Sequence, residues 1–150
     1  MDNYMVRRAE KSDIPFIFSL VKELAIFEKA PHEVTATEAD YEANGFKENP
    51  LFDCFLLFEG ENLAGFALWY YRFSTWKGKR FYLEDLFVKE EYRGKGYGKI
   101  LIEATIEEAK RTKSSGMMWQ VLDWNKPAIK FYERYGVKLD GEWLNVHLDL

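Results

Sequence analysis

The sequence lacks several features that would place it in a special class of protein. It has a single cysteine among 150 residues, which excludes an internal disulfide and suits a reducing compartment. No apolar run approaches the ~18 residues of a membrane span, and residues 1–8 lack the apolar core of a signal peptide. The net charge of −4 gives no basic excess for a nucleic-acid partner. We therefore expect a cytoplasmic protein with neither a nucleic-acid nor a membrane partner.

Histidine is also scarce, and this bears on nucleophilic and metal chemistry. The two histidines, His32 and His147, lie far from Cys54 and from each other in sequence, so no triad or metal-ligand spacing is present. Cys54 sits within an apolar stretch, which favours an inert buried thiol over a nucleophile. We expect no metal and no acyl-enzyme.

What the sequence does contain fits one compact domain over residues 1–150. A chain of this length buries roughly two-thirds of its unfolded surface, and aromatic residues, at 17%, supply much of that area. The acidic balance suits a protein that attracts small cationic molecules.

Hydrophobic periodicity predicts strands that come first in a run and then alternate with helices. We expect strands at Tyr4–Ala9, Asp53–Glu59, Leu63–Phe73, Arg80–Val88, Gly116–Leu122 and Glu142–Leu150. Helices are expected to begin at Ser12 or Asp13 and at Thr37, and to cover Gly98–Lys113 and Lys126–Tyr135, the last ended by Gly136. The pattern predicts an α/β (α+β) fold with one mixed sheet.

The most informative stretch is the apolar strand that ends at Val88 and the glycine-rich loop at Arg93–Lys99, which opens directly onto a helix. Glycines let the backbone approach an anion, and the positive end of the helix adds attraction. This order indicates a site for a phosphate-bearing cofactor. The spacing matches neither the dinucleotide fingerprint nor the Walker loop, so a solvated turn before a helix stays open as the alternative.

The loop resembles a family signature. Arg93-x-x-Gly96-x-Gly98 is similar to the Arg/Gln-x-x-Gly-x-Gly/Ala motif of GCN5-related N-acetyltransferases (GNAT), and Asn125–Gly136 resembles their later Asn-x-x-(Ala/Ser)-x-x-Phe-Tyr segment. Residues 24–29, 70–78, 82–85 and 121–125 resemble the spermidine/spermine N1-acetyltransferase (diamine acetyltransferase) group, nearest its thialysine Nε-acetyltransferase branch. The resemblance implies a single twisted, mostly antiparallel sheet of about six or seven strands with about four helices.

The resemblance also implies acetyl-CoA as the cofactor, its diphosphate held by the loop. The residues that it implies for cofactor binding are Leu86, Phe87, Val88, Arg93, Gly94, Lys95, Gly96, Tyr97, Gly98, Lys99, Asn125, Pro127 and Ala128. Helix capping alone would also explain Asn125. A main-chain N–H of the 86–88 strand is the expected donor to the thioester oxygen.

Acetyl transfer to an amine needs the neutral amine, and an alkylammonium with a pKa near 10.4 costs about 4–5 kcal/mol to deprotonate at pH 7. A nearby carboxylate can bind the cation and take the proton. Glu84 and Asp85 are the candidates, and neighbours on a strand face opposite sides, so only one is expected to face the site. The resemblance selects Glu84 as catalytic; a strand-edge salt bridge is the alternative. Asp85 is assigned a structural or supporting role.

Tyr132 matches the family's tyrosine near the cofactor sulfur and is the expected general acid. On helical spacing alone, core filling is favoured over catalysis for this aromatic residue. The resemblance decides for catalysis.

The substrate-binding residues that the resemblance implies are Phe27, Glu28, Glu33, Trp76 and Glu84, and their acidic and aromatic side chains suit a cationic amine. For Glu28 and Glu33, solvated loop charge is the alternative. Polyamine acetyltransferases carry an Asp two residues before the tryptophan, where this chain has Ser74. The loss of that carboxylate favours a shorter amine, such as a diamine, thialysine or another lysine analogue. Which amine is the physiological acceptor stays open.

Two other functions also stay open. One is a protein or peptide N-acetyltransferase, which should show an open peptide groove; a cap formed by residues 30–50 argues against it. The other is a non-catalytic acyl-CoA-binding module, against which the presence of both Glu84 and Tyr132 argues. The resemblance further implies a homodimer.

Overall fold

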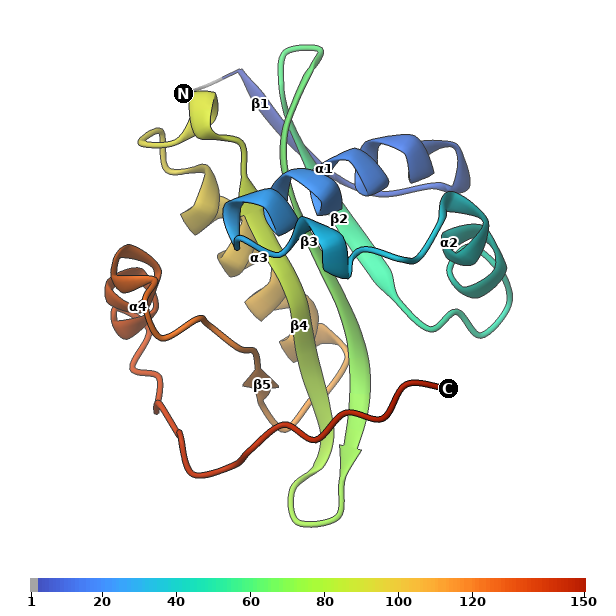
Figure 1. Ribbon diagram of the computed structural model, residues 1–150. Coiled ribbons are helices and arrows are strands. Elements are labelled where there is room, and N and C mark those ends of the chain that lie inside the picture. Colours follow the sequence, from blue (N-terminus) through green and yellow to red (C-terminus); the bar gives the residue numbers. More distant parts are fainter. Residues whose placement is uncertain (1–2) are drawn as a thin grey trace. The chain divides into compact units, whose positions relative to one another are not determined.

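The structure is a computed structural model that describes residues 3–150. Five strands form one sheet in the order β1-β2-β3-β4-β5, antiparallel except for the parallel pair of β4 and β5 (Figure 1). The strands are β1 (Tyr4–Arg8), β2 (Asp53–Glu59), β3 (Asn62–Ser74), β4 (Gly78–Val88) and β5 (Met117–Met118). The helices are α1 (Ile14–Phe27), α2 (Glu38–Asn44), α3 (Tyr97–Arg111) and α4 (Lys126–Glu133). The mixed α/β architecture is confirmed, with fewer strands than expected.

The chain forms two compact units, one ending at Gln120 and the other comprising Val121–Leu150. The first unit contains the whole sheet together with α1, α2 and α3, and the second contains α4. None of the helices in the described residues is long and apolar enough to cross a membrane.

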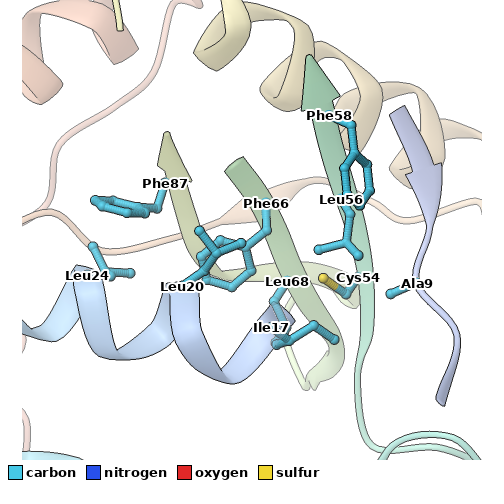
Figure 2. Packing of buried hydrophobic residues seen from close by; sticks show 10 residues of the cluster. All are labelled: Ala9, Ile17, Leu20, Leu24, Cys54, Leu56, Phe58, Phe66, Leu68 and Phe87. Carbon is cyan, nitrogen blue, oxygen red and sulfur yellow. The ribbon is translucent and has the colours of Figure 1, made fainter. Parts of the chain in front are cut away.

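One face of the sheet packs against α1. Ile17, Leu20 and Leu24 recur at helical spacing, are buried, and meet alternate residues of the strands (Figure 2). The strand side chains of this cluster are Cys54, Leu56, Phe58, Phe66, Leu68 and Phe87. Burial of each large side chain is worth about 1.5–3 kcal/mol. This packing holds the C-terminal end of α1 against the middle of the sheet.

Helix α3 covers the other face. Its buried residues Leu101, Ile102 and Thr105 pack over the strands, where Trp69 and Phe81 stack with ring centroids 5.2 Å apart. Because α3 follows the loop after β4, its first turn is held at the end of that strand.

Two expectations on secondary structure are corrected. Only Met117–Met118 of the expected strand at Gly116–Leu122 pairs with β4, and it is not buried. The alternating segment Glu142–Leu150 forms no strand. Alternation supplies an apolar face, but a strand also needs a neighbour to complete its ladder, and the unit from Val121 onward contains no other strand.

The start of α1 falls at the expected residue. Asp13 precedes the helix, but its side chain does not cap it. The carboxylate instead accepts two hydrogen bonds from the Arg7 guanidinium, at 2.7 and 2.9 Å. This fork ties β1 to the beginning of α1 and lowers the pKa of Asp13. At α2, Thr37 is the residue before the helix, as expected, and the Asp40 carboxylate accepts a hydrogen bond from the Thr37 backbone N–H at 2.7 Å.

Candidate active site

A β-bulge in β4 arranges two adjacent carboxylates. Leu68 of β3 pairs with Asp85 and Trp69 pairs with Leu83, so Glu84 is an extra residue in the ladder. The expectation that only one of Glu84 and Asp85 faces the site is wrong, because both line the same pocket. The extra residue breaks the alternation on which that expectation rested.

The pocket has a volume of about 680 Å³ and lies within the first unit. One wall is the last turns of α1, another is the middle of β3 and β4, and the third is the segment from residue 30 to residue 52. The polar residues of its wall are Glu28, Glu33, Asp40, Tyr41, Tyr70, Tyr71, Glu84 and Asp85. The pocket is therefore acidic and aromatic, and among residues 3–150 no Lys, Arg or His belongs to its lining.

Asp85 is the most strongly perturbed group of the pocket. Removal from water raises the pKa of its carboxyl from 3.8 to about 7, and the negative charges of Glu84 and Glu28 add to the shift. Its proton is therefore held to a higher pH than that of an exposed carboxyl. A group with its pKa near the working pH is well matched to accepting and releasing a proton.

Glu28 is coupled to the same group of charges. Desolvation raises its pKa, and the charge of Glu84 adds to that effect. Three carboxyls, from α1 and from the bulge of β4, thus repel one another in one pocket. A cation that enters relieves this repulsion, so the pocket favours a positively charged ligand.

Tyrosines complete the wall around Glu84. The Tyr70 hydroxyl donates to Glu84 Oε1 at 3.2 Å, and its ring stacks on Tyr82 with centroids 5.1 Å apart. Desolvation and the charge of Glu84 raise the pKa of Tyr70 to about 12. The pKa of Tyr41, on the opposite wall, is also raised to about 12, by desolvation and by Asp85 and Glu84. Both hydroxyls remain donors at neutral pH.

The glycine-rich loop adopts a backbone that fits an anion. Gly94 and Gly96 have φ angles of 79° and 83°, in the left-handed region that favours glycine, and Gly96 is the residue before α3. The Ile100 N–H donates to Gly96 O at 3.1 Å, the first bond of this turn. The amides of residues 97–99 therefore point out of the helix end, where an anion is stabilised. These residues fit a diphosphate.

Three side chains of the loop are engaged by the protein itself. The Lys95 ammonium lies 2.9 Å from Glu59 Oε2, and the buried Tyr97 hydroxyl donates to the same carboxylate. The Arg93 Nε donates to Val88 O at 2.9 Å. These side chains shape the loop, which leaves its main-chain amides and the exposed Lys99 for an anion.

The strand residues expected near the thioester lie just before this loop. Val88 pairs with Gly65, Phe87 with Phe66, and Leu86 with Ala67. β5 pairs with β4 only at Phe81 and Tyr82. Within the described sheet, β4 beyond Tyr82 thus has a strand ladder on the β3 side alone.

The remaining predicted residues belong to the second unit. Asn125 precedes α4 and its Oδ1 accepts from Ala128 N at 3.3 Å, which confirms the expected cap. Pro127 lies in the first turn, where its missing N–H costs nothing. Tyr132 is buried, and its ring centroid lies 5.5 Å from that of Phe131.

Of the predicted substrate residues, Glu28, Glu33 and Glu84 line the pocket, while Phe27 and Trp76 do not. Phe27 packs at the end of α1, with its ring centroid 6.4 Å from that of Phe87. Trp76 lies in the turn between β3 and β4 and is 83% exposed. These side chains keep their assignment as predictions.

Sequence reasoning gave no role in proton transfer to Asp85 and did not consider Tyr70. The signal for Asp85 is the bulge, which the composition of β4 does not reveal. Cys54 is fully buried, and burial raises its thiol pKa well above the ordinary value, as an inert thiol requires. In residues 3–150 no three His, Cys, Asp or Glu side chains are grouped to hold a metal ion.

Comparison with known proteins agrees with this geometry. Residues 17–137 match the Acetyltransferase (GNAT) family. A thialysine N-epsilon-acetyltransferase of Mus musculus is 37% identical over 146 residues, covering 92% of this chain and 86% of the relative. A spermidine/spermine N(1)-acetyltransferase-like protein 1 of Homo sapiens is 35% identical over 143 residues, covering 91% of this chain and 21% of that protein.

Among solved structures, an integron cassette protein from the mobile metagenome of V. cholerae superposes with a TM-score of 0.79 at 24% identity, covering 99% of this chain and 94% of the other. This likeness supports the fold. The family match and the mouse relative together show that the chain belongs to the acetyltransferase (GNAT) family and is an N-acetyltransferase.

Proposed function

We propose that the protein transfers acetyl from acetyl-CoA directly to the primary amine of a small cationic substrate, in a ternary complex. The observation that carries this proposal is the placement of Glu28, Glu84 and Asp85 around one pocket, at a bulge in the strand that leads to the glycine loop. The substrate class is a diamine, polyamine, thialysine or lysine analogue. The names of the mouse and human relatives support this class.

In this proposal the pocket carboxylates bind the ammonium and take its proton. Glu84, held by Tyr70, meets the incoming amine. Asp85, with a pKa of about 7, accepts the proton directly or through Glu84. A carboxyl of this pKa can be ionised near neutral pH, so it offers the ammonium a nearby proton acceptor inside the pocket.

The cofactor is proposed to lie along the end of β4 and the loop. Bound acetyl-CoA would supply the acetyl group as a thioester. The amides of residues 94–99 would hold its diphosphate, and an N–H of Leu86–Val88 would stabilise charge on the thioester oxygen. Tyr132 would donate a proton to the leaving sulfur, and Asn125, Pro127 and Ala128 would contact the pantetheine arm.

The walls of the pocket favour a small acceptor over a peptide. Residues 30–52 contribute a large part of the lining, including Ala30, Val34, Ala36 and Leu51. A wall on this side restricts the space for an extended chain. Ser74 at the end of β3 brings no further carboxylate, which favours short amines over spermine.

A direct test is to mix the purified protein with acetyl-CoA and a panel of amines and to measure free thiol. We expect thiol release to need an amine, with thialysine and short diamines giving a higher kcat/KM than spermine. Initial rates at varied concentrations of both substrates should give intersecting lines. Parallel lines, or an acetylated protein detected by mass spectrometry without amine, would overturn the ternary mechanism.

A further inference from the structure

The side chain of Arg93 joins the start of the glycine loop to the end of α1. Its guanidinium carbon lies 4.9 Å from the ring centroid of Phe27 and 5.4 Å from that of Phe87, and its Nε donates to Val88 O at 2.9 Å. One residue is thus fixed to the last turn of α1 and to the last residue of β4. A guanidinium at these distances is attracted to the faces of both aromatic rings.

A second contact follows the same line. The Lys89 ammonium lies 3.6 Å from Glu23 Oε2. Glu23 and Phe27 are one turn apart on α1, so they share one face of the helix. The segment between β4 and the loop therefore runs along this face and touches it at two points, through Lys89 and Arg93.

The contact between Arg93 and Phe27 connects immediate neighbours of the two proposed binding regions. Phe27 precedes Glu28, which lines the acidic pocket. Arg93 precedes Gly94, whose left-handed backbone begins the anion loop. A shift of the loop on binding a diphosphate acts on the Arg93 backbone, and through its side chain on the end of α1.

We propose that Arg93 is a positioning residue that couples the cofactor loop to the acceptor pocket. This inference rests on the proposed function, since it takes the loop as the diphosphate site and the pocket as the amine site. Coupling of two ligands is reciprocal: a bound cofactor that fixes Phe27 and Glu28 tightens amine binding, and a bound amine tightens cofactor binding by the same factor.

The test uses coenzyme A without acetyl, so that no turnover occurs, and thialysine as the amine. The dissociation constant of coenzyme A is measured by calorimetry with and without saturating thialysine. The coupling factor is the ratio of the constant without thialysine to the constant with it. We expect a ratio above one for the wild type. Arg93→Lys keeps the charge but loses the planar stack, and we expect the ratio to fall about two- to five-fold.

Two further variants sharpen the result. Phe27→Leu should lower the ratio as much as Arg93→Lys does. The double variant should lower it no further, because each single variant already removes the same contact between Arg93 and Phe27. The matched control is Lys22→Gln, which removes another cation–π contact of α1, with the Lys22 ammonium 4.7 Å from the Phe18 ring. Its ratio should equal that of the wild type.

Hydrogen exchange supplies a second readout. In the wild type, coenzyme A should protect amides at residues 94–99 and also at Phe27 and Glu28, and Arg93→Lys should lose only the second effect. An unchanged ratio in Arg93→Lys would overturn the coupling, and so would a loss of coenzyme A affinity that is the same with and without thialysine. In either case, turnover by the wild type would still uphold the proposed function. Absence of protection at 94–99 in the wild type would overturn both.

Discussion

The hydroxyl of Tyr70 in β3 donates a hydrogen bond to Glu84 Oε1 in β4 over 3.2 Å, close to the bulge at which the pairing of the two strands shifts by one residue. Since the pKa of Tyr70 is raised to about 12, this hydroxyl keeps its proton and Glu84 is the acceptor. Asp85, one residue on, lies in the same pocket with its pKa raised to about 7. The two carboxyls thus differ: Glu84 receives a hydrogen bond, and Asp85 has its pKa raised toward neutral pH.

The first prediction concerns this pair. Glu84→Gln removes the negative charge that helps to raise the pKa of Asp85, so that pKa falls. The wild-type kcat/KM for the amine should rise with pH through a step near pH 7, and in Glu84→Gln this step should move to lower pH. The value on the plateau should fall about 100-fold or more. A step that stays at its wild-type pH would contradict the coupling of the two groups.

The second prediction concerns stability. The folded-state pKa of Asp85 lies above its ordinary value of 3.8, so the folded protein binds a proton that the unfolded chain has lost between about pH 4 and pH 7. The free energy of unfolding should therefore fall as pH rises through this window, by at most about 4 kcal/mol at 1.36 kcal/mol per unit. Asp85→Asn should remove this contribution of Asp85 to the pH dependence of the free energy of unfolding.

Urea unfolding at several pH values checks this. Asp13 and Glu108 have lowered pKa values, so their contributions are lost only on further acidification and do not mask the window. We expect Asp85→Asn to be nearly independent of pH between 4 and 7, apart from a smaller slope of the same sign from Glu28. Equal slopes in the wild type and Asp85→Asn would sink the assignment.

The third prediction concerns substrate choice. Glu28→Gln removes one of five pocket carboxylates, and it should weaken binding of dicationic amines more than binding of monoamines. KM for a short diamine should rise several-fold, while the coenzyme A dissociation constant stays unchanged. Glu107→Gln, on the exposed part of α3, is the control for net charge. The same rise of KM in both variants would point to a long-range charge effect instead.

Much of the fold follows from local pattern. The apolar spacing of Ile17, Leu20 and Leu24 fixes which face of α1 is buried, and Gly96 stands where a left-handed residue precedes α3. These features depend on neighbours in sequence. The mixed sheet and the match to the family were predictable for that reason.

The bulge was not predictable, because it depends on which residue of β3 pairs with which residue of β4. The bulge changes how β4 pairs with β3 and leaves no mark on the sequence of Tyr82–Val88, yet it places Glu84 and Asp85 in the same pocket. The segment Glu142–Leu150 shows the converse: its alternation is that of a strand, and a partner strand decides whether one forms.

The fourth prediction tests the loop through a matched pair of glycines. Gly94 and Gly78 have φ angles of 79° and 80°, and in both cases an added Cβ meets nothing within 4 Å. Alanine should therefore strain both positions alike and cost each variant about 1 kcal/mol of stability. Only Gly94→Ala should also weaken coenzyme A binding, because only that glycine shapes the anion loop. Calorimetry with equal losses of affinity in both variants would exclude a local role of the loop.

The fifth prediction separates catalysis from packing at Tyr132. Tyr132→Phe keeps the buried ring of α4 and its contact with Phe131, and removes only the hydroxyl. If this hydroxyl protonates the leaving sulfur, kcat should fall about 100-fold or more while the coenzyme A dissociation constant changes little. The control is Tyr135→Phe, two residues beyond the end of α4. An aromatic side chain that only fills the core would give the same kcat in Tyr132→Phe as in the wild type, and that result would remove the acid from the mechanism and leave the pocket carboxylates to account for the rate.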